Sequence, residues 1–132
     1  MLETSELRPP ERALCVKAAE GDPLDLRSHR PGEGDPAQGQ HWGSQRQIRA
    51  QVLVQLLTGH GPQLAATVVA VRLRGAAIAG ELDLCGLTLR CRLELYDCCL
   101  GDRLDLVKAE APDISLRGSR LQQLSAYRLQ LN

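Results

Sequence analysis

The sequence predicts a mainly β protein: a right-handed parallel β-helix, or solenoid, with an N-terminal α-helical cap. Three observations support this prediction. An L-x-L pair recurs about every 11 residues from Val71 to the end of the chain. The 132 residues include only three aromatic side chains, Trp42, Tyr96 and Tyr127, so the core must consist of thin aliphatic layers. Ahead of the repeat, two stretches have helix start and stop signals.

The first predicted helix begins at Pro9 and Pro10 and ends before Gly21. Proline is favoured in the first turn of a helix, and glycine just past its end. The following residues, 21–43, are so rich in glycine and proline that they predict a loop or linker on the surface.

A second helix is predicted between Ser44 and Gly59. Ser44 and Gln47 form a capping-box pattern, and Gly59 stands where a C-terminal cap belongs. Its apolar residues fall on or beside one face: Ile48, Val52, Leu53, Leu56 and Leu57. We expect that face to cover the first coil of the repeat, because a solenoid needs a cap at its end.

The repeat consists of blocks, each of which opens with an L-x-L pair. The first residues of successive pairs lie 11 positions apart, except that Ile114 comes one position earlier. The pairs are Val71/Leu73, Leu82/Leu84, Leu93/Leu95, Leu104/Leu106 and Ile114/Leu116. Five positions after each first member stand Ala76, Leu87, Cys98, Ala109 and Ser119, and seven positions after it stand Ile78, Leu89, Leu100, Ala111 and Leu121. A sixth block opens at Leu124 and places Leu129 and Leu131 at the same offsets. Because side chains alternate across a strand, these positions are predicted to point inward and form stacks.

Each block is predicted to hold two short strands and a turn. The predicted turn residues are Gly75, Gly86, Asp97, Lys108 and Gly118, and the residues expected on the outer face are Arg72, Asp83, Glu94, Asp105 and Ser115. Since one block cannot bury its leucines alone, blocks should stack as parallel strands about 4.8 Å apart. Two blocks would form one coil, which gives roughly three coils. A leucine-rich repeat is the rival fold, but the period of about 11 residues is too short for it.

These residues resemble a known group of proteins. The stretch from Val71-Arg-Leu-Arg-Gly to Leu82-Asp-Leu resembles pentapeptide-repeat β-helix proteins. With Trp42-Gly-Ser-Gln-Arg and the Pro-Glu-Arg-Ala-Leu helix, the chain resembles a bacterial, chiefly actinobacterial, group often labelled membrane-associated oxidoreductase. The helix, linker and repeat patterns predict a solenoid of residues 69–132 behind a helical and linker segment, 1–68. The resemblance implies a redox activity but supplies no catalytic residue.

Composition narrows the classes of partner. Sixteen basic and sixteen acidic residues give no net charge, so no nucleic-acid partner is expected. The N-terminus lacks the features of a secretory signal, and no apolar run approaches the roughly 20 residues that cross a bilayer. These features predict a cytoplasmic protein without an integral membrane segment and leave peripheral membrane contact open. The end at Asn132, without a polar cap, suggests a fragment of a longer solenoid or an end that self-associates.

No catalytic, cofactor-binding or metal-binding residue is predicted. The five cysteines, Cys15, Cys85, Cys91, Cys98 and Cys99, show no paired C-x-x-C spacing. Cys98 is expected to face inward as a compact apolar residue, and Cys85, Cys91 and Cys99 to face outward or lie near turns. The histidines His29, His41 and His60 lie in or beside predicted loops, and Gly32-Glu-Gly34 and Gly59-His-Gly61 lack the context of a phosphate-binding loop.

The sequence therefore predicts a structural or protein-interaction module that binds a protein partner, or a second copy, through a solenoid end or face. The alternative, implied by the resemblance, is a membrane-associated oxidoreductase whose cofactor would lie between the linker and the solenoid. Whether the chain is an enzyme is left open.

Overall fold

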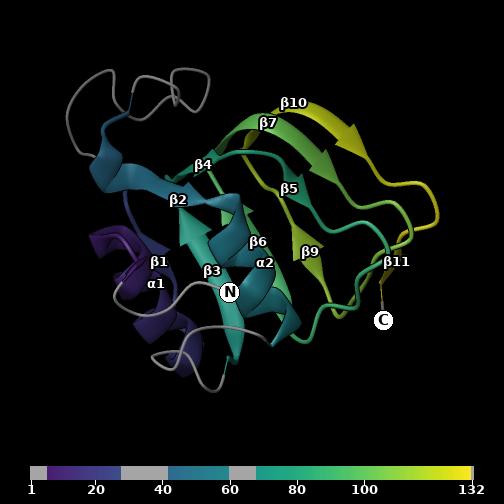
Figure 1. Ribbon diagram of the computed structural model, residues 1–132, viewed down its shortest axis with the longest axis horizontal. Helices are drawn as coiled ribbons and strands as arrows, with labels where there is room; N and C mark the ends of the chain where they lie inside the picture. The colour runs from purple at the N-terminus through teal and green to yellow at the C-terminus, as the bar shows by residue number, and fades with distance from the viewer. Residues whose placement is uncertain (1–5, 28–41, 60–67, 132) are drawn as a thin grey trace.

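The computed structural model describes residues 6–27, 42–59 and 68–131 (Figure 1). Two helices and a set of short strands make up this part of the chain. The elements are α1 (Pro9–Glu20), β1 (Leu24–Asp25), a 3-10 turn (Ser44–Arg46), β2 (Gln47–Arg49), α2 (Ala50–Thr58), β3 (Ala70–Arg74), β4 (Ala77–Ala79), β5 (Leu82–Asp83), β6 (Arg92–Tyr96), β7 (Cys99–Asp105), β8 (Glu110–Ala111), β9 (Ile114–Ser115), β10 (Arg120–Ser125) and β11 (Gln130–Leu131).

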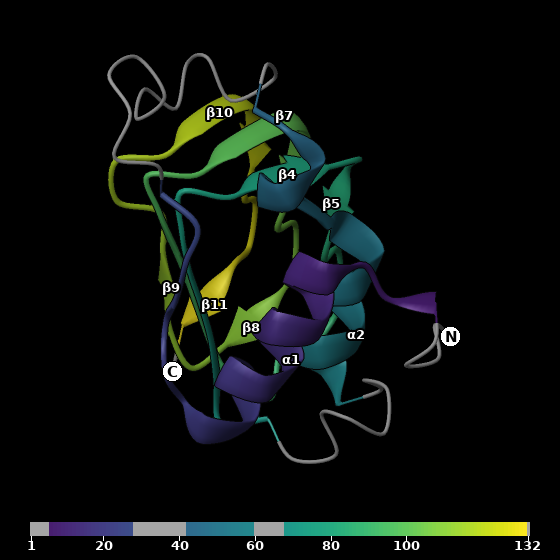
Figure 2. The ribbon, with the colours of Figure 1, turned by 90° about the vertical axis from the view of Figure 1, so that its left-hand side faces the viewer.

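The strands form three parallel sheets, which confirms a β-rich protein with parallel strand pairing. One sheet has the order β1-β3-β6-β9, and a second has the order β10-β7-β4-β2 with β5 also paired to β7. The third consists of β11 and β8. Figure 2 shows the strands of the first two sheets lying one above another around a common interior.

The register joins alternate blocks of the sequence repeat. Val71 pairs with Leu93, which opens the block after next, and Leu93 pairs in the same way with Ile114. On the second sheet Ile78 pairs with Leu100, and Leu100 with Leu121. Within the repeat, strand partners therefore lie two blocks apart and not in the adjacent block, while β1 and β2, which precede the repeat, pair with its first block.

The predicted inward positions of the first four blocks form the core, in which Leu87 is only partly buried. Both members of the first four L-x-L pairs are buried, as are Ala76, Cys98 and Ala109 at the small inward position. The side chains of α1 and α2 complete this core with Leu14, Val52 and Leu56. The fifth pair, Ile114 and Leu116, is only partly buried.

The first helix is confirmed from end to end. α1 begins at Pro9, and Glu11 lies in its first turn. Gly21 ends it in the left-handed conformation with φ of 77°, where the Gly21 N–H donates to the carbonyl of Ala18. A residue without a Cβ adopts this conformation without steric cost.

The stretch predicted as loop contains a short strand. Leu24 and Asp25 form β1, which pairs in parallel with Leu73 and Arg74 of β3. The proline and glycine density around it gave no sign of this strand, because a two-residue strand is stabilised only by the sheet edge beside it.

The second helix begins later than predicted, at Ala50. The capping box of Ser44 and Gln47 does not form a helix start, since Ser44–Arg46 is a 3-10 turn and Gln47–Arg49 is the strand β2. β2 pairs with β4 and buries Ile48 beside Ile78, so tertiary pairing overrides the local helix signal. The predicted end is confirmed, because Gly59 is left-handed with φ of 81°.

The predicted turn residues are confirmed by their backbone. Gly75, Gly86 and Gly118 have φ of 70° or 71°, and Asp97 and Lys108 have φ of 53° and 58°. Arg128 takes the same conformation in the sixth block, with φ of 59°. A left-handed residue thus occupies the turn of each block, and the first block has a second residue with positive φ, Gly80, at 92°.

Candidate protein interface

The cysteines are distributed differently from the prediction. Cys98 is fully buried as expected, and Cys15 on α1 is also buried in the core. Cys85 is exposed, as expected. Cys91 and Cys99, which were predicted to face outward or lie near turns, are both buried, so they do not face outward. Cys99 belongs to a small cluster of its own with Trp42 and Ala77, separate from the main core.

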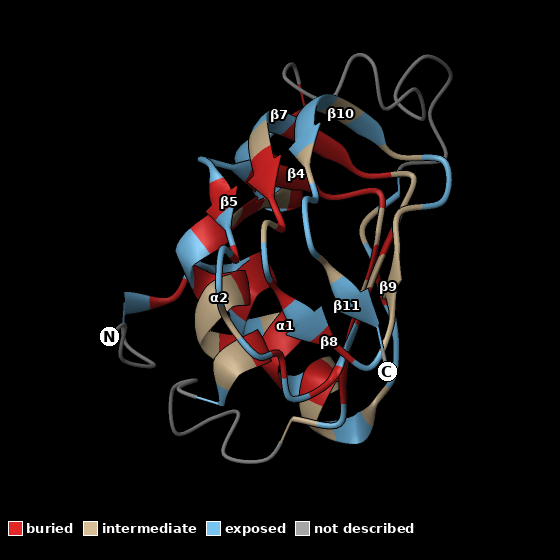
Figure 3. Ribbon diagram, turned by 90° about the vertical axis from the view of Figure 1, so that its right-hand side faces the viewer, coloured by how far each residue is buried: buried red, intermediate tan, exposed pale blue. Residues whose placement is uncertain are grey.

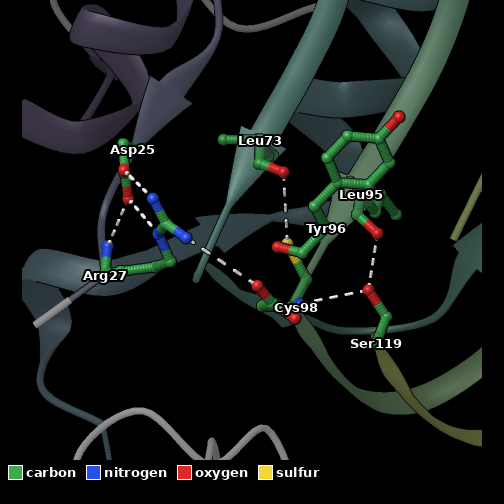
Figure 4. Close-up of polar contacts among 8 residues, drawn as sticks. Asp25, Arg27, Leu73, Leu95, Tyr96, Cys98 and Ser119 are labelled. Carbon is green, nitrogen blue, oxygen red and sulfur yellow. Dashed lines mark hydrogen bonds and ion pairs between the residues drawn. The ribbon is translucent and has the colours of Figure 1, made fainter. Parts of the chain in front are cut away.

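Cys98 lies in a polar corner built by three segments of backbone (Figure 4). Its thiol lies 3.4 Å from the carbonyl of Tyr96 and 3.7 Å from that of Leu73, close enough to donate a weak hydrogen bond. Its N–H donates to the Ser119 hydroxyl at 3.1 Å, and that hydroxyl donates to the carbonyl of Leu95 at 2.6 Å. The cysteine and the serine at the small inward position thus form hydrogen bonds with backbone groups of neighbouring blocks.

The buried thiols are poor nucleophiles. Burial raises the pKa of Cys98 to about 12, and burial together with the charge of Glu11 raises the pKa of Cys15 to about 11. Burial also raises the pKa of Cys91. Since the thiolate is the reactive form, these three cysteines are packing residues.

A surface ion network flanks the same corner. The Arg27 guanidinium binds Asp25 at 2.6 Å and lies 4.0 Å from Asp97, and all three side chains are exposed (Figure 4). The hydrogen bonds from Arg27 lower the pKa of the Asp25 carboxyl. Exposed pairs of this kind contribute little to stability or binding.

Asp83, Cys85 and Asp105 bring three ligand-type atoms within 4.8 Å of one another. Their proximity follows from the repeat, because Asp83 and Asp105 are register partners. Each carboxylate accepts the N–H two residues further on at 3.0 Å, and Arg103 donates to Asp105 at 2.7 Å. This arginine already supplies the positive charge that a metal ion would bring, so the cluster is a turn-stabilising feature.

Asp105 corrects one outer-face prediction. It is buried, whereas Asp83 at the equivalent position is exposed. Asp83 and Ser125 are its register partners on either side, and the Arg103 side chain reaches across it. An outer-face residue in a middle strand is therefore covered by its neighbours.

The hollows on the described surface include the following three. One, of about 250 Å³, lies beside β4 and β7 and includes Cys99 and Asp102. A second, of about 420 Å³, lies between the start of α1 and the 3-10 turn and is mostly apolar. A third, of about 320 Å³, is lined by Arg72, Arg90 and Arg92, but Glu94 lies within 4 Å of two of these guanidiniums.

The glycine and histidine motifs offer no ligand site in the described residues. His29, His41, His60 and Gly32-Glu-Gly34 lie outside the residues that the structure describes. Gly59 ends α2, so it sits at the negative end of the helix dipole, and a phosphate needs the positive end.

Of the five large apolar side chains that are exposed in the described residues, three lie on or beside the C-terminal strands, β9, β10 and β11 (residues 112–131). Leu124 is 47% exposed, Leu131 52% and Tyr127 66%. Figure 3 shows β10 and β11 drawn mostly as exposed, whereas β7, the partner of β10, also contains buried residues. Each C-terminal strand has one parallel partner, β6, β7 or β8, and the structure describes none on its other side.

The prediction that the leucines of the sixth block point inward is wrong for Leu124 and Leu131. Leu129 is partly buried against the core, while Leu124 and Leu131 are the exposed leucines. Tyr127 had no place in the repeat pattern; its position just before the left-handed Arg128 is the signal that puts it on a corner.

No family model, curated protein or solved structure matches this chain. Within the ranges described, neither α1 nor α2 is long and apolar enough to cross a membrane. The geometry of the molecule is therefore the basis for assigning a function.

Proposed function

We propose that this chain is a structural, protein-interaction module, built as a right-handed β-helix that is capped by helices at one end and binds protein at the other. The constant spacing of two blocks between register partners supports the coil. In this reading, residues 70–89, 90–111 and 112–131 form successive coils. The right hand is the one that nearly all parallel strand connections adopt.

The helices support the assignment of a closed end. α1 contacts β1, β2 and β3, and α2 contacts β2, β3 and β5. These strands begin the two large sheets, so the helices cover the end opposite the C-terminal strands (Figure 2). The helices thereby obstruct head-to-tail stacking of copies, whereas the C-terminal strands have exposed apolar side chains among the described residues.

The single observation that carries the proposal is the combination of an unpaired strand edge with exposed leucines on the C-terminal strands. Unpaired N–H and C=O groups in a row recruit another strand, which is how many domains bind extended peptides. Leu124 and Leu131 provide apolar area that a neighbouring coil would bury.

The test uses a fluorescent peptide with the sequence of residues 112–131, whose leucines match the spacing of the edge. Fluorescence anisotropy is measured in about 1 M NaCl, where the Debye length is about 3 Å and charge effects are small. We expect the chain to bind this peptide. Leu124→Asp should abolish binding, because it places a charge in the new contact.

The matched control is Val16→Asp, which changes an exposed apolar residue on α1 at the covered end. It should leave binding unchanged. Absence of binding to the unmodified chain, or equal loss with both variants, would rule out the C-terminal strands as the interaction surface.

Oxidoreductase activity stays a hypothesis that rests on the resemblance alone. No specific feature of the described residues favours it over the interaction module. Release of a flavin or nicotinamide on denaturation of the purified protein, seen by absorbance and mass spectrometry, would support it.

A further inference from the structure

The C-terminal strands have a charge that the rest of the repeat lacks. Residues 112–131 contain Arg117, Arg120 and Arg128 against the single acid Asp113. Residues 71–111 contain six basic and seven acidic side chains, so they are almost balanced. The excess positive charge of the repeat is thus concentrated on its exposed edge.

The three arginines are available to a partner. All are exposed, and none forms an ion pair with a carboxylate of the described residues. Arg117 lies 5.8 Å from the Tyr96 ring centroid and Arg128 lies 5.2 Å from that of Tyr127, contacts that leave their charge uncompensated.

We infer that the C-terminal strands bind an acidic, leucine-containing segment of a protein partner in preference to a second copy of this chain; the inference rests on the proposed function. The protein itself shows how such a contact forms. Arg72 and Glu94 are register partners on neighbouring strands, and their side chains form an ion pair at 3.3 Å. A segment with acids at the equivalent positions would repeat this pairing beside Arg117, Arg120 and Arg128.

A second copy fits this edge less well. Because the helices cover the opposite end, two copies would meet through their C-terminal strands and bring the three arginines of each copy to one contact. Like charges directly opposite each other on neighbouring strands are destabilising, and opposite charges are stabilising. The positive charge of the C-terminal strands therefore favours an acidic segment over a second copy of this chain.

The experiment compares two fluorescent peptides that differ only in charge. One has the sequence of residues 112–131, and the other has the same sequence with Arg117, Arg120 and Arg128 each replaced by Glu. At low salt we expect the acidic peptide to bind roughly tenfold more tightly or better, because three charge pairs replace three like-charge contacts. In about 1 M NaCl the two affinities should converge.

Charge reversal in the protein provides the matched control. The triple variant Arg117→Glu, Arg120→Glu, Arg128→Glu should reverse the preference and bind the arginine-containing peptide more tightly. Equal affinity for both peptides at low salt would overturn the charge inference and leave the binding edge intact. Failure of both peptides to bind would instead overturn the proposed function.

Sedimentation velocity distinguishes the second copy as occupant. We expect the unmodified chain to be monomeric at low salt. A dimer that Leu124→Asp dissociates and that Val16→Asp leaves intact would overturn the inference, because the edge would then favour a like-charged copy.

Discussion

The buried carboxylate of Glu11 joins the starts of both helices through Arg49. Its Oε2 accepts the Arg49 N–H at 3.0 Å and the Arg49 Nε at 2.9 Å, and its Oε1 accepts Arg49 Nη2 at 2.7 Å. Oε1 also accepts the N–H of Arg8, the residue before α1, at 2.9 Å. Arg49 is the residue before α2, so one carboxylate forms hydrogen bonds at the N-termini of both helices and links them.

The Glu11 contact predicts a large loss of stability for Glu11→Gln. The variant keeps an acceptor but loses the charge that satisfies Arg49, and we expect about 2–3 kcal/mol of destabilisation. Glu20→Gln, at the exposed end of the same helix, should change stability by no more than about 0.5 kcal/mol. Urea unfolding measures both; similar values for the two variants would contradict the role of Glu11.

The same contact predicts a pH dependence. Burial alone would raise the pKa of Glu11, but the hydrogen bonds from Arg49 and from the Arg8 N–H lower it below its ordinary value of 4.5. A lowered folded-state pKa stabilises the protein above the unfolded-state value, and this contribution is lost as the pH falls below about 4.5. The difference in unfolding free energy between the unmodified chain and Glu11→Gln should therefore shrink from about pH 7 to about pH 3.

The backbone conformations of two glycines predict different effects on stability when each is replaced by alanine. Gly86 has φ of 71° and open space around its Cα, so Gly86→Ala introduces backbone strain without a clash. We expect a loss of about 1–2 kcal/mol. Gly43 also has open space but an ordinary φ of −67°, so Gly43→Ala should be neutral or slightly stabilising. Thermal unfolding that gave equal losses would contradict the corner geometry.

The two hydrogen bonds of the Ser119 hydroxyl predict that the protein loses stability when this hydroxyl is removed. Ser119→Ala removes the acceptor of the Cys98 N–H and the donor to the Leu95 carbonyl, and we expect about 1–2 kcal/mol of destabilisation. Ser115→Ala on the outer face of β9 serves as the control, with about 0.5 kcal/mol or less. Native hydrogen exchange should show faster exchange of the Cys98 amide only in the first variant.

The exposure of the five cysteines predicts that one thiol reacts quickly in the folded protein. Cys85 is the exposed thiol, while the other four are buried. An aromatic disulfide reagent should modify one thiol quickly in the folded protein and the remaining four only on unfolding. Cys85→Ser should remove the fast phase. A second fast thiol in the native protein would show that Cys91 or Cys99 is accessible.

Much of the architecture could be predicted from local pattern. The L-x-L offsets predicted the buried pairs of the first four blocks but not the exposure of Leu124 and Leu131. The predicted turn residues from Gly75 to Gly118 are all left-handed, although Gly80, which also has a positive φ, was not predicted. The surface that we propose for interaction was predictable only as an end of the repeat. Its exposed leucines and its arginine excess depend on which strands lack a neighbour.

The errors share one cause. β1, β2 and the burial of Cys91, Cys99 and Asp105 all depend on segments distant in the sequence that supply hydrogen bonds or cover a face. Ser44 and Gln47 satisfy a helix-start pattern, yet the edge of β4 offers residues 47–49 a better set of backbone partners.

Local sequence is enough to define the repeat, the alternation of inward and outward side chains and the position of each corner, because these depend on residues within one block. The assembled fold was needed to establish where α2 begins, which outer residues are covered, and that Leu124 and Leu131 face solvent. Those features depend on which strands have neighbours on both sides, a property of the assembled sheets and not of any single block.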